Sequence, residues 1–308
     1  MRIAIMGAGG IGSCYGGLLA RAGNDVTLIA RGAHLQALKQ NGLQLNCPDE
    51  SFTVQVPATD DPSEIGPVDL VLFTVKTNQN SDAIPVMKPL IGNDTTVLTL
   101  QNGVESAGEI GQDYGVDRVL PGAAYIVAYV VSPGEVTQHN PEVRIAFGES
   151  GGALSPRAIS IRDTLSEASI TADLSDDIAK VIWSKFLFNA PVNAMASAAR
   201  TPPRQLMETP EGSASFRTAM QEVANIGQAK GVHLGEAAID NAMDFIGTVS
   251  ITARGSMLTD LDAGRPLELE ATVGSVCRIG RQVNVPTPIN NLLYALLLPY
   301  KDGPPGES

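Results

Sequence analysis

A glycine-rich motif of the kind that binds nucleotide phosphates lies near the start of the chain. It fits the pattern GxGxxG and comprises Gly7, Ala8, Gly9, Gly10, Ile11 and Gly12. An apolar strand is expected at residues 2–6 and a helix at 10–22, so the motif joins a strand to a helix. Glycines there permit a tight turn and a close approach of the backbone to a pyrophosphate, while the helix N-terminus offers free N–H groups. The motif predicts a dinucleotide site, and a glycine turn without a ligand is the alternative.

The residue after the second expected strand bears on which dinucleotide is bound. Proteins that bind NAD usually carry Asp or Glu at this point, where the carboxylate accepts a hydrogen bond from the ribose 2′-OH. Here the strand at 25–30 is followed by Arg31. A guanidinium can pair with a 2′-phosphate through charge-assisted hydrogen bonds, so the sequence favours NADPH over NADH. An arginine that only meets solvent is the alternative.

Two more polar residues follow buried strands. Lys76 comes after the apolar run at 69–75, and Asn102 comes after the run at 97–100. Residues just beyond the carboxyl ends of parallel strands line the ligand crevice of such a sheet. We therefore expect Lys76 near the adenosine phosphates and Asn102 on the nicotinamide side, although each could be an ordinary loop residue.

A polar stripe marks the second half of the chain. Lys185, Asn189 and Asn193 recur every four residues, which places them on one face of a helix. The surrounding residues 182–195 are almost wholly apolar, so this helix should be buried and its polar groups should face a polar cleft. The alternative is a solvent-facing edge of a core helix. Pro191 removes an N–H donor inside the segment and predicts a kink beside Asn189.

A second polar cluster occupies residues 255–268. Gly264 is typical of a helix end, Pro266 of the first position of the next helix, and Glu268 of its first turn. First-turn glutamates commonly complement the helix dipole, so Glu268 by itself indicates structure more than chemistry.

The 308 residues suit two domains, and the order of elements predicts an α/β fold. Strands alternate with helices in the first half, which indicates a doubly wound Rossmann sheet in a domain at 1–175. Antiparallel strands within 122–149 should close that sheet. The second domain, 176–308, is expected to be helical, with helices near 177–198, 212–230, 236–260 and 267–282.

The composition excludes several classes of partner. A net charge of −12 without a basic block opposes nucleic-acid binding, and the three histidines form no zinc-binding pair. Three scattered cysteines suggest reduced thiols in a cytoplasm. The uncharged run at 3–20 is better explained by a buried strand, loop and helix than by a membrane span. The expected partner is a small molecule, and a homodimer is left open.

These motifs, in this order, resemble the ketopantoate reductase (2-dehydropantoate 2-reductase) family over nearly the whole chain. The matching segments are GAGGIG, Arg31, the VKT of Lys76, the QNG of Asn102, WSKFLFNAPVN at 183–193 and SMLTDLDAGRPLE at 256–268. The resemblance implies a Rossmann domain followed by a helical domain of the 6-phosphogluconate dehydrogenase C-terminal type. It also implies NADPH-dependent reduction of ketopantoate to pantoate.

The resemblance further implies roles for individual residues. Lys185 would be the general acid, with Glu268 close to it and to the nicotinamide ribose. Ala128 would lie near the cofactor. The residues implied to hold the substrate, together with Lys185, are Asn102, Asn189, Asn193 and Ser256.

The implied chemistry is physically coherent. Negative charge grows on the ketone oxygen as hydride reaches the carbon, and a lysine there stabilises the charge and supplies the proton. Apolar surroundings should lower the lysine pKa from its reference of about 10.4, while Glu268 limits the fall. Reduction of another branched 2-oxo acid is the first alternative, since the loop at 199–203 lacks an asparagine that some members use. A non-catalytic NADPH sensor, which needs no acid, is the second.

Overall fold

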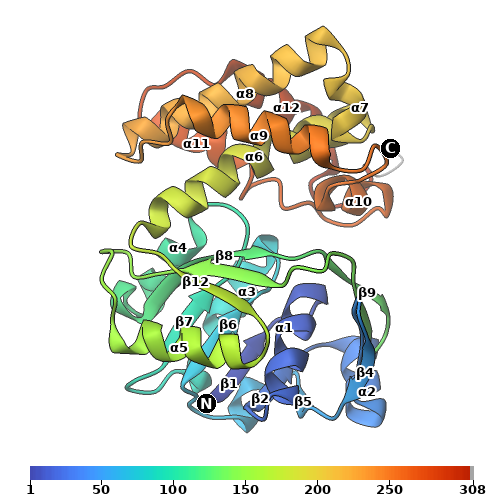
Figure 1. Ribbon diagram of the computed structural model, residues 1–308, viewed down its shortest axis with the longest axis vertical. Coiled ribbons are helices and arrows are strands. Elements are labelled where there is room, and N and C mark those ends of the chain that lie inside the picture. The colour runs from blue at the N-terminus through green and yellow to red at the C-terminus, as the bar shows by residue number, and fades with distance from the viewer. Residues whose placement is uncertain (306–308) are drawn as a thin grey trace. The chain divides into compact units, whose positions relative to one another are not determined.

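The computed structural model describes residues 1–305 and divides the chain into two compact units. Unit 1 comprises Met1–Gln101 and Ser106–Ile178, and unit 2 comprises Asn102–Glu105 and the chain from Ala179 onward (Figure 1). From the sequence we predicted a domain boundary at residue 175, with the short segment 102–105 in the first domain. Residues 306–308 of the predicted second domain lie outside the described residues.

Unit 1 contains an eight-stranded sheet in the order β12-β11-β8-β7-β6-β1-β2-β5. Every neighbouring pair in it is parallel except β8 with β11. The strands are β1 (Arg2–Met6), β2 (Asp25–Ile29), β5 (Ala58–Thr59), β6 (Leu70–Phe73), β7 (Thr96–Thr99), β8 (Val119–Tyr125), β11 (Arg144–Phe147) and β12 (Thr171–Leu174). The predicted Rossmann-type sheet is confirmed. Because β1 lies between β2 and β6, the strand order reverses beside β1, where ligands bind in folds of this type.

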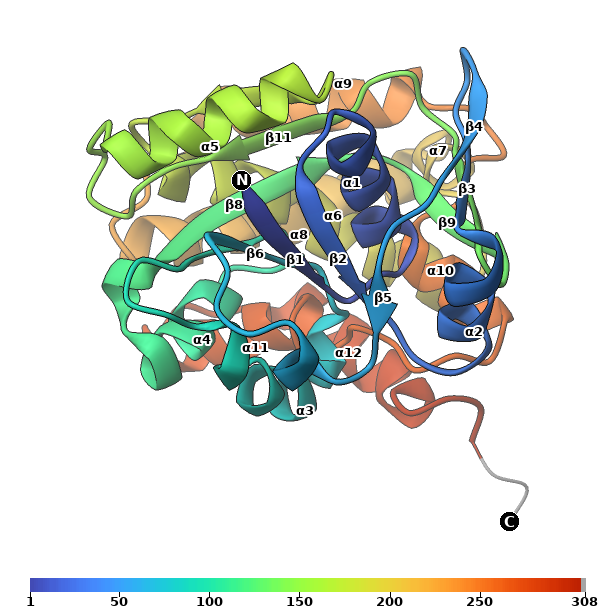
Figure 2. The same cartoon turned by 90° about the horizontal axis from the view of Figure 1, so that it is seen from below.

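Helices cover both faces of this sheet, as Figure 2 shows. The helices of unit 1 are α1 (Gly10–Arg21), α2 (Gly32–Asn41), α3 (Asn80–Val86), α4 (Ser106–Tyr114) and α5 (Pro156–Glu167). Short 3-10 turns lie at η1 (Pro62–Glu64), η2 (Thr77–Gln79), η3 (Lys88–Leu90) and η4 (Val116–Arg118).

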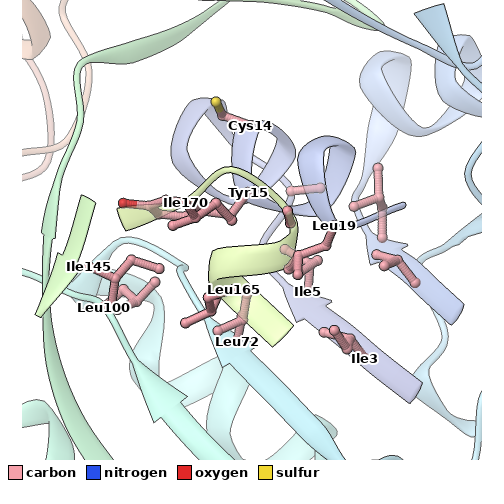
Figure 3. Packing of buried hydrophobic residues seen from close by; sticks show 14 of the residues in the cluster. Ile3, Ile5, Cys14, Tyr15, Leu19, Leu72, Leu100, Ile145, Leu165 and Ile170 are labelled. Atoms are coloured by element: carbon pink, nitrogen blue, oxygen red, sulfur yellow. The ribbon is translucent and has the colours of Figure 1, made fainter. Parts of the chain in front are cut away.

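Successive side chains of β1 and β6 point to opposite faces of the sheet, which explains the two apolar layers of unit 1. Ile3, Ile5 and Leu72 point to the layer that holds α1 and α5 (Figure 3). Their neighbours Ala4 and Phe73 point to the opposite layer, which holds α3 and α4. Strands buried on both faces give continuous apolar runs, which is why the sequence marked them clearly.

A second sheet of four strands, in the order β4-β3-β10-β9, was not predicted as such. Its strands are β3 (Leu43–Asn46), β4 (Ser51–Val54), β9 (Ala128–Ser132) and β10 (Glu135–Gln138). The expectation that all strands in 122–149 close the main sheet is therefore wrong for β9 and β10. Gly17 of α1 accounts for the packing, since a Cβ there would lie 2.3 Å from Leu45 Cδ1. The small sheet can thus bury its leucines against α1 and need not extend the large sheet.

Unit 2 is helical, as predicted. Its helices are α6 (Ile178–Ala199, which starts at the last residue of unit 1), α7 (Pro203–Met207), α8 (Pro210–Ala229), α9 (Glu236–Thr248), α10 (Ser256–Asp262), α11 (Val273–Gln282), α12 (Pro288–Leu297) and the short η5 (Leu298–Tyr300). Its core packs Trp183, Phe186 and Leu187 of α6 against α8, α9 and α11, including Phe216 of α8. The helix α6 continues through Pro191.

Two helix limits in unit 2 differ from the prediction. The single helix expected at 236–260 is broken between α9 and α10, and the helix expected at 267–282 begins only at Val273. Gly264, with φ of +65°, ends α10 as predicted. Beyond it the Leu267 amide donates to the carbonyl of Lys301 at 2.8 Å, and the Leu267 side chain is buried. This tertiary bond and burial hold the residues from Ala263 to Thr272 in an irregular path, so Glu268 is not a first-turn residue.

A buried carboxylate holds the start of α12. Glu222 of α8 is 5% exposed and accepts hydrogen bonds from the Ile289 amide at 2.9 Å and from the Asn290 amide at 3.0 Å. The Asn290 side chain also donates to it, at 2.7 Å. The carboxylate therefore satisfies N–H groups that the first turn of α12 cannot satisfy itself.

Replacement of Glu222 by Ala should lower the free energy of unfolding by about 2–3 kcal/mol, because it leaves buried donors without an acceptor. Urea denaturation followed by circular dichroism measures this. Glu211→Ala, at an exposed position in the first turn of the same helix, is the matched control. Equal effects of the two substitutions would contradict the capping role.

Candidate active site

A pocket in unit 2 gathers most of the side chains that the sequence linked to a substrate. It has about 230 Å³ of empty space, part of it open to solvent. The lining residues are Asn102, Asn189, Asn193, Ser256, Met257, Asp260, Glu268 and Thr272. All of them belong to unit 2, including Asn102, because the segment Asn102–Glu105 is part of that unit. The structure thus brings together five predicted site residues from four separate stretches of chain.

Lys185 lies one turn before Asn189 on α6 and interacts electrostatically with the carboxylate of Glu268. Some of its surface remains exposed, but the protein around the ammonium replaces enough water to change its proton affinity. Desolvation lowers the pKa of Lys185 from 10.5 to about 8, and the charge of Glu268 opposes part of that fall. A lysine with this pKa can exchange protons near neutral pH.

The two asparagines of the stripe are joined to each other. The Asn193 side-chain amide donates to the backbone carbonyl of Asn189 at 3.0 Å, which fixes the orientation of the amide group. Asn193 is 7% exposed, and its Oδ1 has no hydrogen-bond partner among residues 1–305. Buried acceptors of this kind are costly unless something donates to them. This oxygen is therefore a candidate acceptor for a ligand.

Gly255 makes room for Asn193. It precedes α10, and a Cβ at this position would lie 2.0 Å from Asn193 Oδ1. Only a residue without a side chain permits this approach, which also sets the start of α10 and hence the place of Ser256. The break between α9 and α10 is thus tied to the geometry of the pocket.

Glu268 is held by the irregular segment that follows α10. The Thr272 hydroxyl donates to the Glu268 carbonyl at 2.8 Å. Upstream, Arg265 Nε donates to Asp260 Oδ1 at 2.8 Å, and the Arg265 amide donates to the Asp260 carbonyl at the same distance. Asp260 is 5% exposed. These bonds order both ends of the stretch that carries Glu268.

In unit 1 the glycine-rich loop lies beside the end of β6. Gly7 has a φ of +100°, and a Cβ there would lie 2.6 Å from Val75 Cγ1. The Thr74 hydroxyl donates to the Gly7 carbonyl at 2.8 Å, which ties the two loops together. By contrast, a Cβ on Gly9 would meet nothing within 4 Å in the part of the chain that is described. The loop is therefore packed from one side and open at Gly9.

Ala128 and Gly10 lie in contact, because a Cβ on Gly10 would lie 2.2 Å from the Ala128 carbonyl oxygen. The resemblance implies that Ala128 lies near the cofactor, and in the structure Ala128 lies against the glycine-rich loop. Arg31 precedes α2 and is exposed, and its Nη2 donates to Gln79 Oε1 at 3.5 Å. Gln79 closes the 3-10 turn that Lys76 precedes, so both cations border the same loop region.

Three residues that were not predicted from the sequence also line the pocket: Met257, Asp260 and Thr272. Asp260 stands four residues after Ser256 and could have been found by the spacing that revealed the stripe on α6. The same spacing extends the stripe to Ser197, whose hydroxyl is buried without a hydrogen-bond partner among the described residues.

Residues 1–305 contain neither a group of potential metal-binding side chains nor a membrane-spanning helix. No group of three His, Cys, Asp or Glu side chains there could hold a metal ion. None of the helices in that range combines the length and apolar character needed to cross a bilayer.

Comparison with known proteins places the chain in a family. Residues 3–152 match the model of ketopantoate reductase PanE/ApbA, and residues 177–301 match the model of its C-terminal domain. The 2-dehydropantoate 2-reductase of Mesorhizobium japonicum is 32% identical over 96% of this chain and 97% of that protein. The corresponding protein of Halobacterium salinarum is 28% identical over 98% of this chain and 100% of its own length.

Solved structures agree with these matches. A 2-dehydropantoate 2-reductase from Geobacter metallireducens superimposes with a TM-score of 0.92 at 30% identity, covering 97% of this chain and 99% of that one. A D-mandelate dehydrogenase in complex with NADH and anilino(oxo)acetate gives a TM-score of 0.91 at 27% identity, covering 98% of each chain. With both of its domains matched, the chain belongs to the ketopantoate reductase family of oxidoreductases.

Proposed function

We propose that this protein reduces ketopantoate to pantoate with NADPH. The observation that carries the proposal is the pairing of Lys185, which has a pKa of about 8, with Glu268, which lines a pocket that also presents amide and hydroxyl groups. A cation at the edge of such a pocket suits a substrate whose oxygen gains negative charge during the reaction. A protein that only senses a dinucleotide has no need for a lysine tuned in this way.

The residues of unit 1 fit a dinucleotide phosphate. Side chains at Gly7, Gly10 and Gly12 would clash with the protein, while Gly9 is open and caps the N-terminus of α1 without a side-chain bond. The N–H groups at that helix end can hold the pyrophosphate. Arg31 and Lys76 would pair with the adenosine phosphates, and bound NADPH supplies a hydride to the substrate carbonyl carbon.

Lys185 acts as the general acid. Its ammonium donates a hydrogen bond to the substrate carbonyl oxygen and passes a proton to it as charge develops there. Glu268 keeps the lysine protonated and directs the ammonium. Ser256 and the amides of Asn102 and Asn189 hold the carboxylate and hydroxyl groups of the substrate without adding a competing charge.

The buried Oδ1 of Asn193 supports a substrate with a hydroxyl group. Ketopantoate has a hydroxyl that can donate to this oxygen, whereas 2-oxoisovalerate and pyruvate do not. A site built to bond a hydroxyl discriminates against an analogue without one, because its own polar group then stays unpaired. The preference should be seen in kcat/KM.

Initial rates of NADPH oxidation test the proposal. We expect the highest kcat/KM with ketopantoate, compared with 2-oxoisovalerate, pyruvate and phenylglyoxylate. Preference for phenylglyoxylate would instead align the protein with the mandelate dehydrogenase that it resembles in structure. Failure to oxidise NADPH with any of the four would overturn the proposal.

Arg31→Glu should weaken NADPH binding by about 2–3 kcal/mol, because it replaces a charge-assisted pair with repulsion from the 2′-phosphate. NADH binding should change much less. Fluorescence titration of both cofactors measures the effect, with Arg162→Glu, at a solvent-accessible ion pair on α5, as the control. Equal losses for the two cofactors, or a wild type that prefers NADH, would contradict the assignment.

The rate of reduction should depend on the protonation of Lys185. Because the reaction uses the ammonium, kcat/KM should be at its maximum below pH 8 and decline as pH rises through about 8. Glu268 raises the pKa of Lys185, so Glu268→Gln should move this decline to lower pH. Pantoate oxidation uses the free amine of Lys185, so its kcat/KM should rise as the pH increases through about 8.

The pH profile of Glu211→Gln, which lies on α8 outside the pocket, should match the wild type. A decline that stays at the same pH in Glu268→Gln would show that another group controls the rate.

A further inference from the structure

The segment Asn102–Glu105 interrupts unit 1 and belongs to unit 2. Its neighbours on both sides are buried in unit 1: Gln101, whose side chain donates to the Val75 carbonyl at 2.8 Å, and Ser106. Asn102 nevertheless lines the pocket of unit 2. The other residues that line this pocket belong to the continuous chain beyond Ala179, so Asn102 alone among them depends on an inserted segment.

The middle of the segment is in close contact with unit 2. Gly103 has a φ of +92°, and a Cβ at this position would lie 2.5 Å from the carbonyl oxygen of Ala271. Val104 packs against the core formed by α6, α8, α9 and α11. Glycine permits this path but does not stabilise it, because its backbone has more conformations to lose than that of any other residue.

Glu105 provides the polar anchor. Its Oε2 accepts hydrogen bonds from the Ser275 hydroxyl and, at 2.5 Å, from Arg278 Nη2. Arg278 Nη2 also lies 3.1 Å from Ser275 Oγ, and Nη1 lies 3.6 Å from Glu270 Oε2. Ser275 is fully buried on α11. One oxygen of the carboxylate is therefore held by two side chains of one helix of unit 2.

We propose that Glu105 is a positioning residue that holds Asn102 in the substrate pocket through Ser275 and Arg278. Without this anchor, the flexibility of Gly103 allows the segment 102–105 to lose its contacts with unit 2. Asn102 then leaves the pocket. With the anchor, Asn102 acts on the substrate as part of unit 2, and Glu105 affects catalysis only through it. This role rests on the proposed function, because the substrate that Asn102 binds is ketopantoate.

Glu105→Ala should raise KM for ketopantoate roughly ten-fold while the NADPH dissociation constant stays within about two-fold of wild type. Glu105→Gln, which can still accept from Ser275, should fall between Glu105→Ala and wild type. If Glu105 acts through Asn102, the double variant with Asn102→Ala should be no worse than Asn102→Ala alone. Asp240→Ala, which removes an exposed ion pair with Arg217 in the same unit, should leave all constants unchanged.

Hydrogen exchange supplies a measurement that does not require activity. In Glu105→Ala the peptide that covers residues 102–106 should lose protection while α6 and α8 retain theirs. If wild type fails to reduce ketopantoate, the proposed function falls but this result still tests the anchor. Ser275→Ala offers the same test should Glu105→Ala fail to fold.

Unchanged KM and unchanged exchange would overturn the proposal. So would losses in the double variant that multiply, or a general loss of protection across unit 2, because these results would indicate an independent or merely structural role.

Discussion

The desolvation of the Lys185 ammonium beside the carboxylate of Glu268 is the constraint on which the rest of unit 2 depends. A charged lysine enclosed by protein loses hydration, and its pKa falls accordingly to about 8. Without Glu268 the amine would lose more of its charge near neutral pH. The carboxylate must therefore remain within electrostatic reach of α6, although it comes from a part of the chain about eighty residues later.

The irregular stretch between α10 and α11 meets this requirement. A helix starting at Pro266 would commit Glu268 to the geometry of a first turn. Instead, the backbone follows an irregular path. It is held there by the hydrogen bond from the Leu267 amide to the Lys301 carbonyl and by the ion pair of Asp260 with Arg265. Backbone bonds lost from a helix are replaced by tertiary ones, which is the usual condition for a stable irregular segment. The position of the carboxylate thus depends on packing as much as on sequence spacing.

This dependence on packing explains which parts of the fold and of the site could be predicted from the sequence. The glycine motif and the buried strands β1, β6 and β7 were predictable, because their signals are local: glycine conformation and continuous apolar runs. The stripe of Lys185, Asn189 and Asn193 was found from helical periodicity. Tertiary contacts determine the pairing of β9 and β10, the late start of α11 and the place of Asn102 in unit 2. Such contacts do not change the periodicity of the sequence, so these features could not be predicted from it. The role of Gly255 likewise requires knowing that Asn193 lies against it.

Relatives with this fold are named 2-dehydropantoate 2-reductase and D-mandelate dehydrogenase, so the fold alone does not determine the substrate. The proposed acid catalysis requires Lys185 and Glu268 to work as one unit, and a double-mutant cycle in kcat tests that directly. Lys185→Ala should lower kcat by roughly 10²–10⁴, and adding Glu268→Ala should make the enzyme little worse. Losses that simply multiply, or a wild-type kcat in Lys185→Ala at every pH, would contradict it.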